Sequence, residues 1–73
     1  MTRPNDYVVK PTPAGRIDDA LLALGVGEAY EFSASHKNSL TSRVSLLNRD
    51  HAPARWRTRV ERLQFKFYVI RVA

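Results

Sequence analysis

Hydrophobic residues recur with a helical period in the middle of the chain. Leu40, Val44 and Leu47 follow an i, i+4, i+7 spacing, which places them on one face of a helix. Asn38 or Ser39 can cap the N-terminus of this helix, and the His-Ala-Pro sequence after residue 50 ends it. The pattern predicts the main helix of the protein, ending at about residue 50.

A shorter helix is expected over residues 16–25. Two aspartates, Asp18 and Asp19, suit its first turn, because a helix N-terminus attracts negative charge. Gly25 fits a C-terminal cap. The residues that would share the apolar face of this helix are Ile17, Leu21 and Leu24.

Alternating polar and apolar positions indicate strands over residues 27–32, 55–61 and 65–72. The last of these is apolar on both faces beyond Lys66, so we expect it at the centre of a sheet or covered on both sides. A tight turn at residues 62–64 would join the last two strands into a hairpin.

The first 16 residues contain three of the four prolines, which exclude a regular helix there. We expect an extended, mobile arm, in which Tyr7-Val8-Val9 can add a short edge strand. Residues 17–73 are then a single α+β domain. Its expected architecture is an antiparallel sheet of about three strands, one main helix packed on that sheet, and a C-terminal β-hairpin.

Length and composition restrict the class of protein. A chain of 73 residues buries a small core, and with no cysteine it has neither a disulfide nor a cysteine-based zinc site. No apolar run is long enough to span a bilayer, and the N-terminus lacks the apolar segment of a signal peptide. We therefore expect a soluble, cytoplasmic protein.

The net charge of +5 is unevenly distributed. Residues 1–31 carry three basic and five acidic side chains, whereas residues 32–73 carry nine basic and two acidic ones. Nine of the twelve basic residues are arginines, which favour bidentate contacts with phosphate or carboxylate. The bias indicates a nucleic acid or an acidic protein as partner.

The basic half contains one strand in which charged and uncharged residues alternate strictly. Period two predicts a core face made by Trp56, Thr58 and Val60, opposite a row of arginines about 7 Å apart. Charged residues also protect strand edges and solvate an open sheet face, so a simple solvated surface is the alternative interpretation. The interface candidates are Arg55, Arg57, Arg59 and Arg62, with Arg43 and Arg49 on the main helix as second choices.

No catalytic, cofactor-binding or metal-binding arrangement is visible in the sequence. His36 and His51 are the only side chains with a pKa normally near neutrality, and each stands alone, as surface histidines usually do. The chain has no P-loop, GxGxxG or HExxH motif. We expect a protein that is not an enzyme and that uses no cofactor.

Several short motifs carry a resemblance to known proteins. They are Leu24-Gly25-Val26-Gly27-Glu28, Ser39-Leu40-Thr41-Ser42-Arg43-Val44, Trp56-Arg57-Thr58-Arg59 and Val69-Ile70-Arg71-Val72. These motifs resemble those of small open reading frames of tailed phages. In length, basic character and its opening Met1-Thr2-Arg3-Pro4, the chain resembles a small RNA polymerase-binding transcription regulator of a Xanthomonas phage.

The resemblance implies a protein that binds host RNA polymerase in the host cytoplasm. It implies inhibition of initiation and readthrough of intrinsic terminators, through contacts with the N-terminal region of the β′ subunit and the RNA-exit channel. It also implies cooperation with NusA and proximity to nascent RNA. The alternative from the residues alone is a basic β-hairpin module that binds nucleic acid directly.

Overall fold

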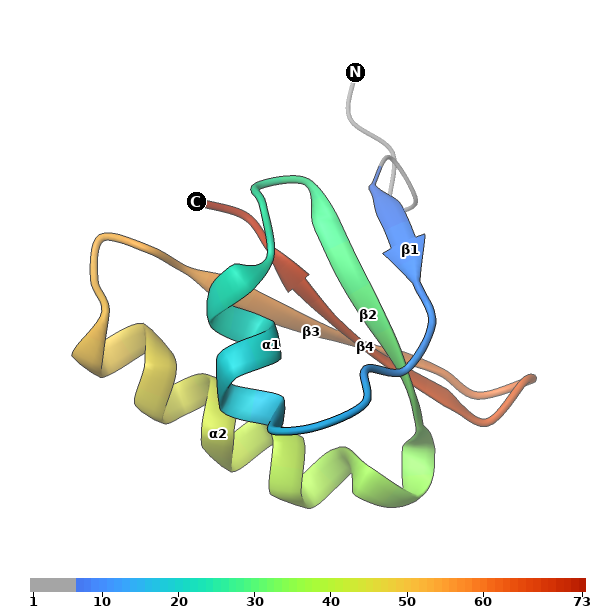
Figure 1. Ribbon diagram of the computed structural model, residues 1–73. Coiled ribbons are helices and arrows are strands. Elements are labelled where there is room, and N and C mark those ends of the chain that lie inside the picture. The colour runs from blue at the N-terminus through green and yellow to red at the C-terminus, as the bar shows by residue number, and fades with distance from the viewer. Residues whose placement is uncertain (1–6) are drawn as a thin grey trace.

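The computed structural model describes residues 7–73, which form four strands and two α-helices (Figure 1). Two α-helices lie on one side of the sheet, and the hairpin projects from one end of it (Figure 1). In chain order the elements are β1 (Val8–Lys10), α1 (Ile17–Ala23), β2 (Glu28–Ser33), a 3₁₀ turn (Ala34–His36), α2 (Lys37–Asp50), β3 (Trp56–Glu61) and β4 (Lys66–Arg71).

The sheet has the strand order β1-β2-β4-β3, which confirms the α+β class and the C-terminal hairpin. The expectation of an antiparallel sheet of about three strands is corrected in two respects. The sheet has four strands, and it is mixed, because β1 pairs in parallel with β2. β4 lies between β2 and β3, as its apolar character on both faces predicted.

The edge strand that the arm was expected to be able to add is present as β1. After β1, the Thr12 hydroxyl donates a hydrogen bond to the Glu31 carbonyl of β2 at 2.5 Å. The remaining expectation for the arm, that it is mobile, falls partly on residues 1–6, which lie outside the described part of the chain.

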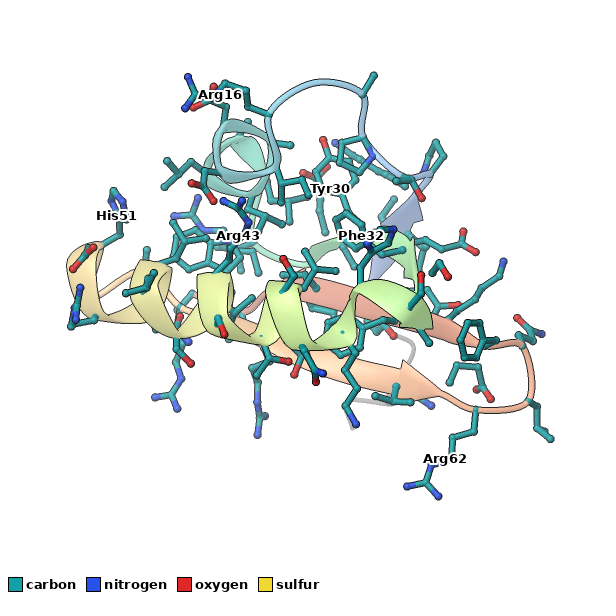
Figure 2. The ribbon with its side chains drawn as sticks, turned by 90° about the horizontal axis from the view of Figure 1, so that it is seen from below. Arg16, Tyr30, Phe32, Arg43, His51 and Arg62 are labelled. Atoms are coloured by element: carbon teal, nitrogen blue, oxygen red, sulfur yellow. The ribbon has the colours of Figure 1, made fainter. Side chains whose placement is uncertain are left out.

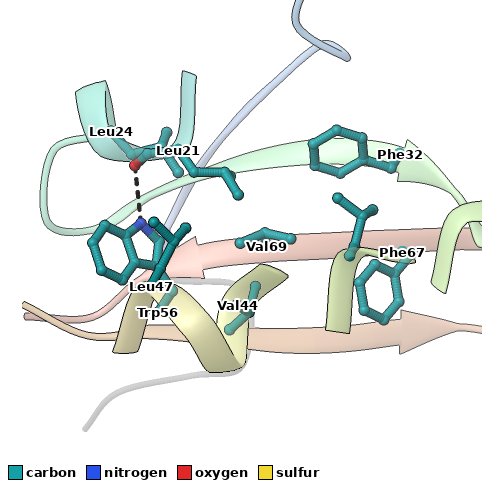
Figure 3. Close-up of a cluster of buried hydrophobic side chains, with 9 residues drawn as sticks. Leu21, Leu24, Phe32, Val44, Leu47, Trp56, Phe67 and Val69 are labelled. Atoms are coloured by element: carbon teal, nitrogen blue, oxygen red, sulfur yellow. Dashed lines mark hydrogen bonds between the residues drawn. The ribbon is translucent and has the colours of Figure 1, made fainter. Parts of the chain in front are cut away.

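Both helices bury their apolar faces against the same face of the sheet (Figure 3). The three residues predicted to face the core on the main helix are all buried. Of the three predicted for the shorter helix, Leu21 is buried within α1, and Leu24 is buried at the C-cap position directly after it. The buried cluster consists of Leu21, Leu24, Phe32, Leu40, Val44, Leu47, Trp56, Phe67 and Val69, with Ile17, Tyr30 and Ala54 packed against it.

The helix ends differ from the sequence expectation. α2 begins at Lys37 without a side-chain cap, because a 3₁₀ turn leads directly into it. Ser33 caps that turn instead, accepting a hydrogen bond from the Ser35 N–H. The turn before β2 uses Gly27, with a φ of +87°, while Gly25 donates its N–H to the Glu28 carboxylate.

Trp56 connects the edge strand to both helices. Its indole N–H donates to the Leu21 carbonyl of α1 at 2.9 Å, inside the core (Figure 3). Its backbone N–H donates to the Asn48 side chain of α2 at 2.7 Å, and its carbonyl accepts from the same amide at 3.0 Å. The Arg71 guanidinium lies 5.2 Å from the centre of the indole ring. The prediction that Trp56 belongs to the core is confirmed.

The prediction that Thr58 and Val60 are also core residues is wrong. They point to the same side of the sheet as Trp56, but Thr58 is exposed and Val60 keeps 37% of its surface exposed. β3 is the edge strand, and beyond Trp56 its outward side has no neighbouring strand. Phe65, expected in the last strand, lies instead in the four-residue turn between β3 and β4.

Candidate partner-binding surface

The strand alternation places two of the predicted arginines on the sheet face opposite the helices. In the β3–β4 register Arg57 lies opposite Ile70 and Arg59 opposite Tyr68, whereas Thr58 lies opposite the buried Val69. Since residues paired across two strands share a face, Arg57 and Arg59 face away from the core. The predicted row is therefore real along β3, and Glu61 continues it opposite Lys66.

Arg55 extends this row beyond the N-terminal end of β3. Its backbone N–H donates to the Ala73 carbonyl, and its carbonyl accepts from the N–H groups of Val72 and Ala73, so it continues the pairing with the last residues of the chain. The side chain is exposed. Main-chain bonds thus hold the position of Arg55 while the guanidinium remains available to a partner.

Arg62 lies in the turn at the other end of β3, where its side chain extends away from the body of the protein (Figure 2). Arg55, Arg57 and Arg62 are all exposed, and none forms an ion pair with a carboxylate in residues 7–73. We call Arg55, Arg57, Arg59 and Arg62 the arginine surface.

The second-choice arginines are placed differently. Arg43 turns towards α1, where its Nη1 donates to the Asp18 Oδ1 at 2.7 Å (Figure 2). It links the two helices, and it lies on the helical side of the sheet. Arg49 donates to Asp50 at 3.0 Å. Together with Arg55 it lines a shallow hollow of about 420 Å³ at the end of α2, so Arg49 adjoins the arginine surface and Arg43 does not.

Lys66 contributes little free positive charge to the same face. Its ammonium forms an ion pair with Glu31 of β2. The hydrogen bond that the Lys66 ammonium donates to the Glu31 carboxylate raises the pKa of Lys66 above the ordinary value of 10.5, although partial desolvation acts in the opposite direction. Lys66 is therefore charged at neutral pH but already matched by a carboxylate.

Two apolar residues at the hairpin turn were not anticipated as surface features. Leu63 is 97% exposed and Phe65 is 63% exposed. Phe65 also adopts a φ of +53°, a left-handed conformation that costs an L-residue with a side chain about 1–2 kcal/mol. The sequence signal was the lack of glycine or asparagine in a turn of this kind.

The aspartates and histidines have structural surroundings. Asp18 and Asp19 lie in the first turn of α1, as predicted. His36 precedes α2, and the exposed His51 follows it, with its ring 6.4 Å from that of Trp56 in an edge-on arrangement. Within residues 7–73, no three His, Cys, Asp or Glu side chains converge as a potential metal site.

None of the described helices has the length and apolar character needed to cross a membrane. No protein-family model, curated protein or solved structure significantly matches the chain.

Proposed function

We propose that this protein is a non-enzymatic regulator that binds host bacterial RNA polymerase through the arginine surface. The observation that carries the proposal is the set of three exposed arginines, Arg55, Arg57 and Arg62, that have no carboxylate partner in the described chain. Several other basic side chains of the described protein are paired with carboxylates, as in the contacts of Arg43 with Asp18 and of Lys66 with Glu31. Unpaired guanidinium groups on one strand and its turn favour an acidic partner.

The identity of the partner comes from the resemblance to the Xanthomonas phage regulator called p seven. On that basis the protein acts in the host cytoplasm on the β′ N-terminal region and the RNA-exit channel, with NusA as a cooperating factor. It would inhibit initiation and prevent termination by blocking the RNA-exit channel, which impedes the hairpins that form at intrinsic terminators, and by bridging mobile parts of the enzyme, which restrains its clamp. Arginines near emerging RNA would also be suited to its phosphates.

Charge reversal tests the proposal. Arg57→Glu combined with Arg62→Glu should weaken binding to purified RNA polymerase core enzyme at least about tenfold, since both guanidinium contacts become repulsive. The matched control is Arg16→Glu with Lys37→Glu, which changes the net charge equally at exposed positions away from β3. Biolayer interferometry measures both affinities. Absence of wild-type binding at micromolar concentration, or equal weakening by the control, would refute the proposal.

A second candidate is direct binding of single-stranded nucleic acid to the open face of the sheet. It is favoured by Tyr68, a partly buried aromatic residue that lies in register with Arg59 on that face. Such a combination of ring and guanidinium suits a base and its phosphate. Affinity for a single-stranded RNA probe would then fall steeply as the salt concentration rises. Binding to polymerase without measurable binding to free RNA would reject this candidate.

A further inference from the structure

The turn between β3 and β4 presents two large apolar side chains to solvent at one end of the sheet. Leu63 has almost its whole surface exposed, and Phe65 has nearly two thirds of its surface exposed. In Figure 1 this turn, drawn in orange and red, projects beyond the helices. We call residues Arg62–Phe65 the hairpin tip.

Hydrogen bonds of the main chain hold the backbone of the hairpin tip. The Phe65 N–H donates to the Arg62 carbonyl at 3.3 Å, and the Ala34 N–H donates to the Phe65 carbonyl at 3.0 Å. The Leu63 N–H donates to the Glu61 carboxylate at 3.2 Å. Every one of these bonds would form equally well with a polar residue at 63 or 65.

The backbone conformation of Phe65 also indicates that this side chain is not there to stabilise the turn. Positions with a positive φ in hairpin turns are usually occupied by glycine or asparagine, which adopt this conformation at little cost in free energy. A phenylalanine here carries a conformational penalty, and 63% of its surface remains in water instead of being buried. Folding alone therefore favours another residue at this position, which suggests that the ring serves a contact outside the chain.

Charge around the tip indicates what kind of surface it fits. Arg62 is exposed next to Leu63 and has no carboxylate partner in the described chain. The nearby Glu61 carboxylate is engaged by the Leu63 N–H. An apolar pair bordered by the Arg62 guanidinium complements an apolar pocket bordered by a carboxylate.

We propose that Leu63 and Phe65 form an apolar anchor that inserts into a hydrophobic, acid-bordered pocket on the protein partner. The inference rests on the proposed function, because the pocket belongs to the partner that the arginine surface contacts. A second copy of the chain is disfavoured, since two tips would bring like-charged Arg62 side chains together. An anionic membrane is disfavoured because only two apolar side chains would enter it, and Glu61 would be carried to its surface.

The test removes the anchor while preserving the turn. Leu63→Ser with Phe65→Asn replaces both apolar groups, and asparagine tolerates the left-handed conformation. Affinity for RNA polymerase core enzyme should fall about 30-fold or more, as expected when a buried anchor pair is lost. Two control variants should bind with an affinity within about threefold of wild type, because neither removes an apolar group from the proposed anchor. They are Leu63→Met with Phe65→Tyr, which keeps the apolar bulk, and Val26→Ser, which removes a 65% exposed apolar residue from a turn at the opposite end of the sheet.

The thermal unfolding midpoint of Phe65→Asn gives an independent readout and should equal or exceed that of wild type. A fall in this midpoint would show that the ring stabilises the fold and would overturn the inference. So would wild-type affinity in the Leu63→Ser, Phe65→Asn variant, which would leave the proposed function standing. Absence of any wild-type binding to polymerase would overturn both. Tip-dependent binding to phosphatidylserine-containing vesicles would reject the protein pocket in favour of a membrane.

Discussion

At the scale of single residues, Trp56 joins β3 to both α-helices. It is 1% exposed, bonds to α1 through its indole N–H, and bonds to α2 through its backbone. The fold of a 73-residue chain has few other large buried side chains to share this role. A change at this position should therefore affect the stability of the whole protein rather than of one strand.

Trp56→Phe should lower the free energy of unfolding by about 2–4 kcal/mol. The smaller ring leaves a cavity, and the buried Leu21 carbonyl loses its indole donor. Urea denaturation followed by far-ultraviolet circular dichroism measures the loss. Trp56→Ala should cost about 3–5 kcal/mol, which is enough to unfold a small domain. A Trp56→Phe loss below about 0.5 kcal/mol would contradict a structural role for the hydrogen bond.

At the scale of elements, β3 is an edge strand whose first outward-facing backbone groups are covered by a side chain. The Asn48 amide accepts from the Trp56 N–H and donates to the Trp56 carbonyl, as a neighbouring strand would. Thr58 and Val60 have no such cover and remain exposed. Asn48 therefore fixes where α2 meets the edge of the sheet.

Asn48→Asp should lower the free energy of unfolding by about 1–2 kcal/mol. The carboxylate still accepts from the Trp56 N–H but cannot donate to the Trp56 carbonyl. Asn48→Ala removes both bonds and should cost more. Ser45→Ala, at an exposed position of the same helix, is the control and should change stability little. Equal stabilities of the aspartate and alanine variants would show that the donated bond carries the whole effect.

Helices and strands were predictable from the sequence where the spacing of apolar residues matches the buried face of the element. The α2 face of Leu40, Val44 and Leu47 and the central position of β4 are examples, because tertiary burial and local pattern agree there. Thr58 and Val60 share the periodic pattern of a core face, but a pattern cannot reveal that its strand lies at the edge. Parallel pairing of β1 depends on long-range contacts that no local signal encodes.

The candidate site was predictable only in part, for a related reason. Alternation placed Arg57 and Arg59 correctly on one face. It could not show that Arg43 is drawn to Asp18, since the two residues are 25 positions apart and meet only when α1 and α2 pack together. Phe65 was assigned to a strand because its apolar character matched the strand that follows, whereas its positive φ places it in the turn.

At the scale of the whole molecule, one carboxylate joins the N-terminal strand to the turn before β2. Glu28 accepts from the Gly25 N–H at 2.7 Å and pairs with Lys10 of β1 at 3.2 Å. The Gly25 hydrogen bond, followed by the bond to Lys10, lowers the pKa of Glu28 below its ordinary value of 4.5. Charged Glu28 thus favours the folded state.

This coupling predicts a loss of stability in acid. Because the pKa of Glu28 is lower in the folded than in the unfolded protein, its contribution is present above about pH 4.5 and disappears as the pH falls through the lowered value. Thermal unfolding midpoints between pH 3 and pH 7 should fall less steeply below pH 4.5 for Glu28→Gln than for wild type. Identical acid limbs in the two proteins would contradict the assignment.

The position of the only tryptophan has a spectroscopic consequence. The indole of Trp56 is buried, bonded to α1 and close to the Arg71 guanidinium, so its fluorescence reports the docking of helix, edge strand and central strand at once. No labelling or added tryptophan is needed to follow that docking. A partner that binds the hairpin tip and leaves the core closed would keep the emission maximum at short wavelength, whereas one that detaches α1 would shift it to the red.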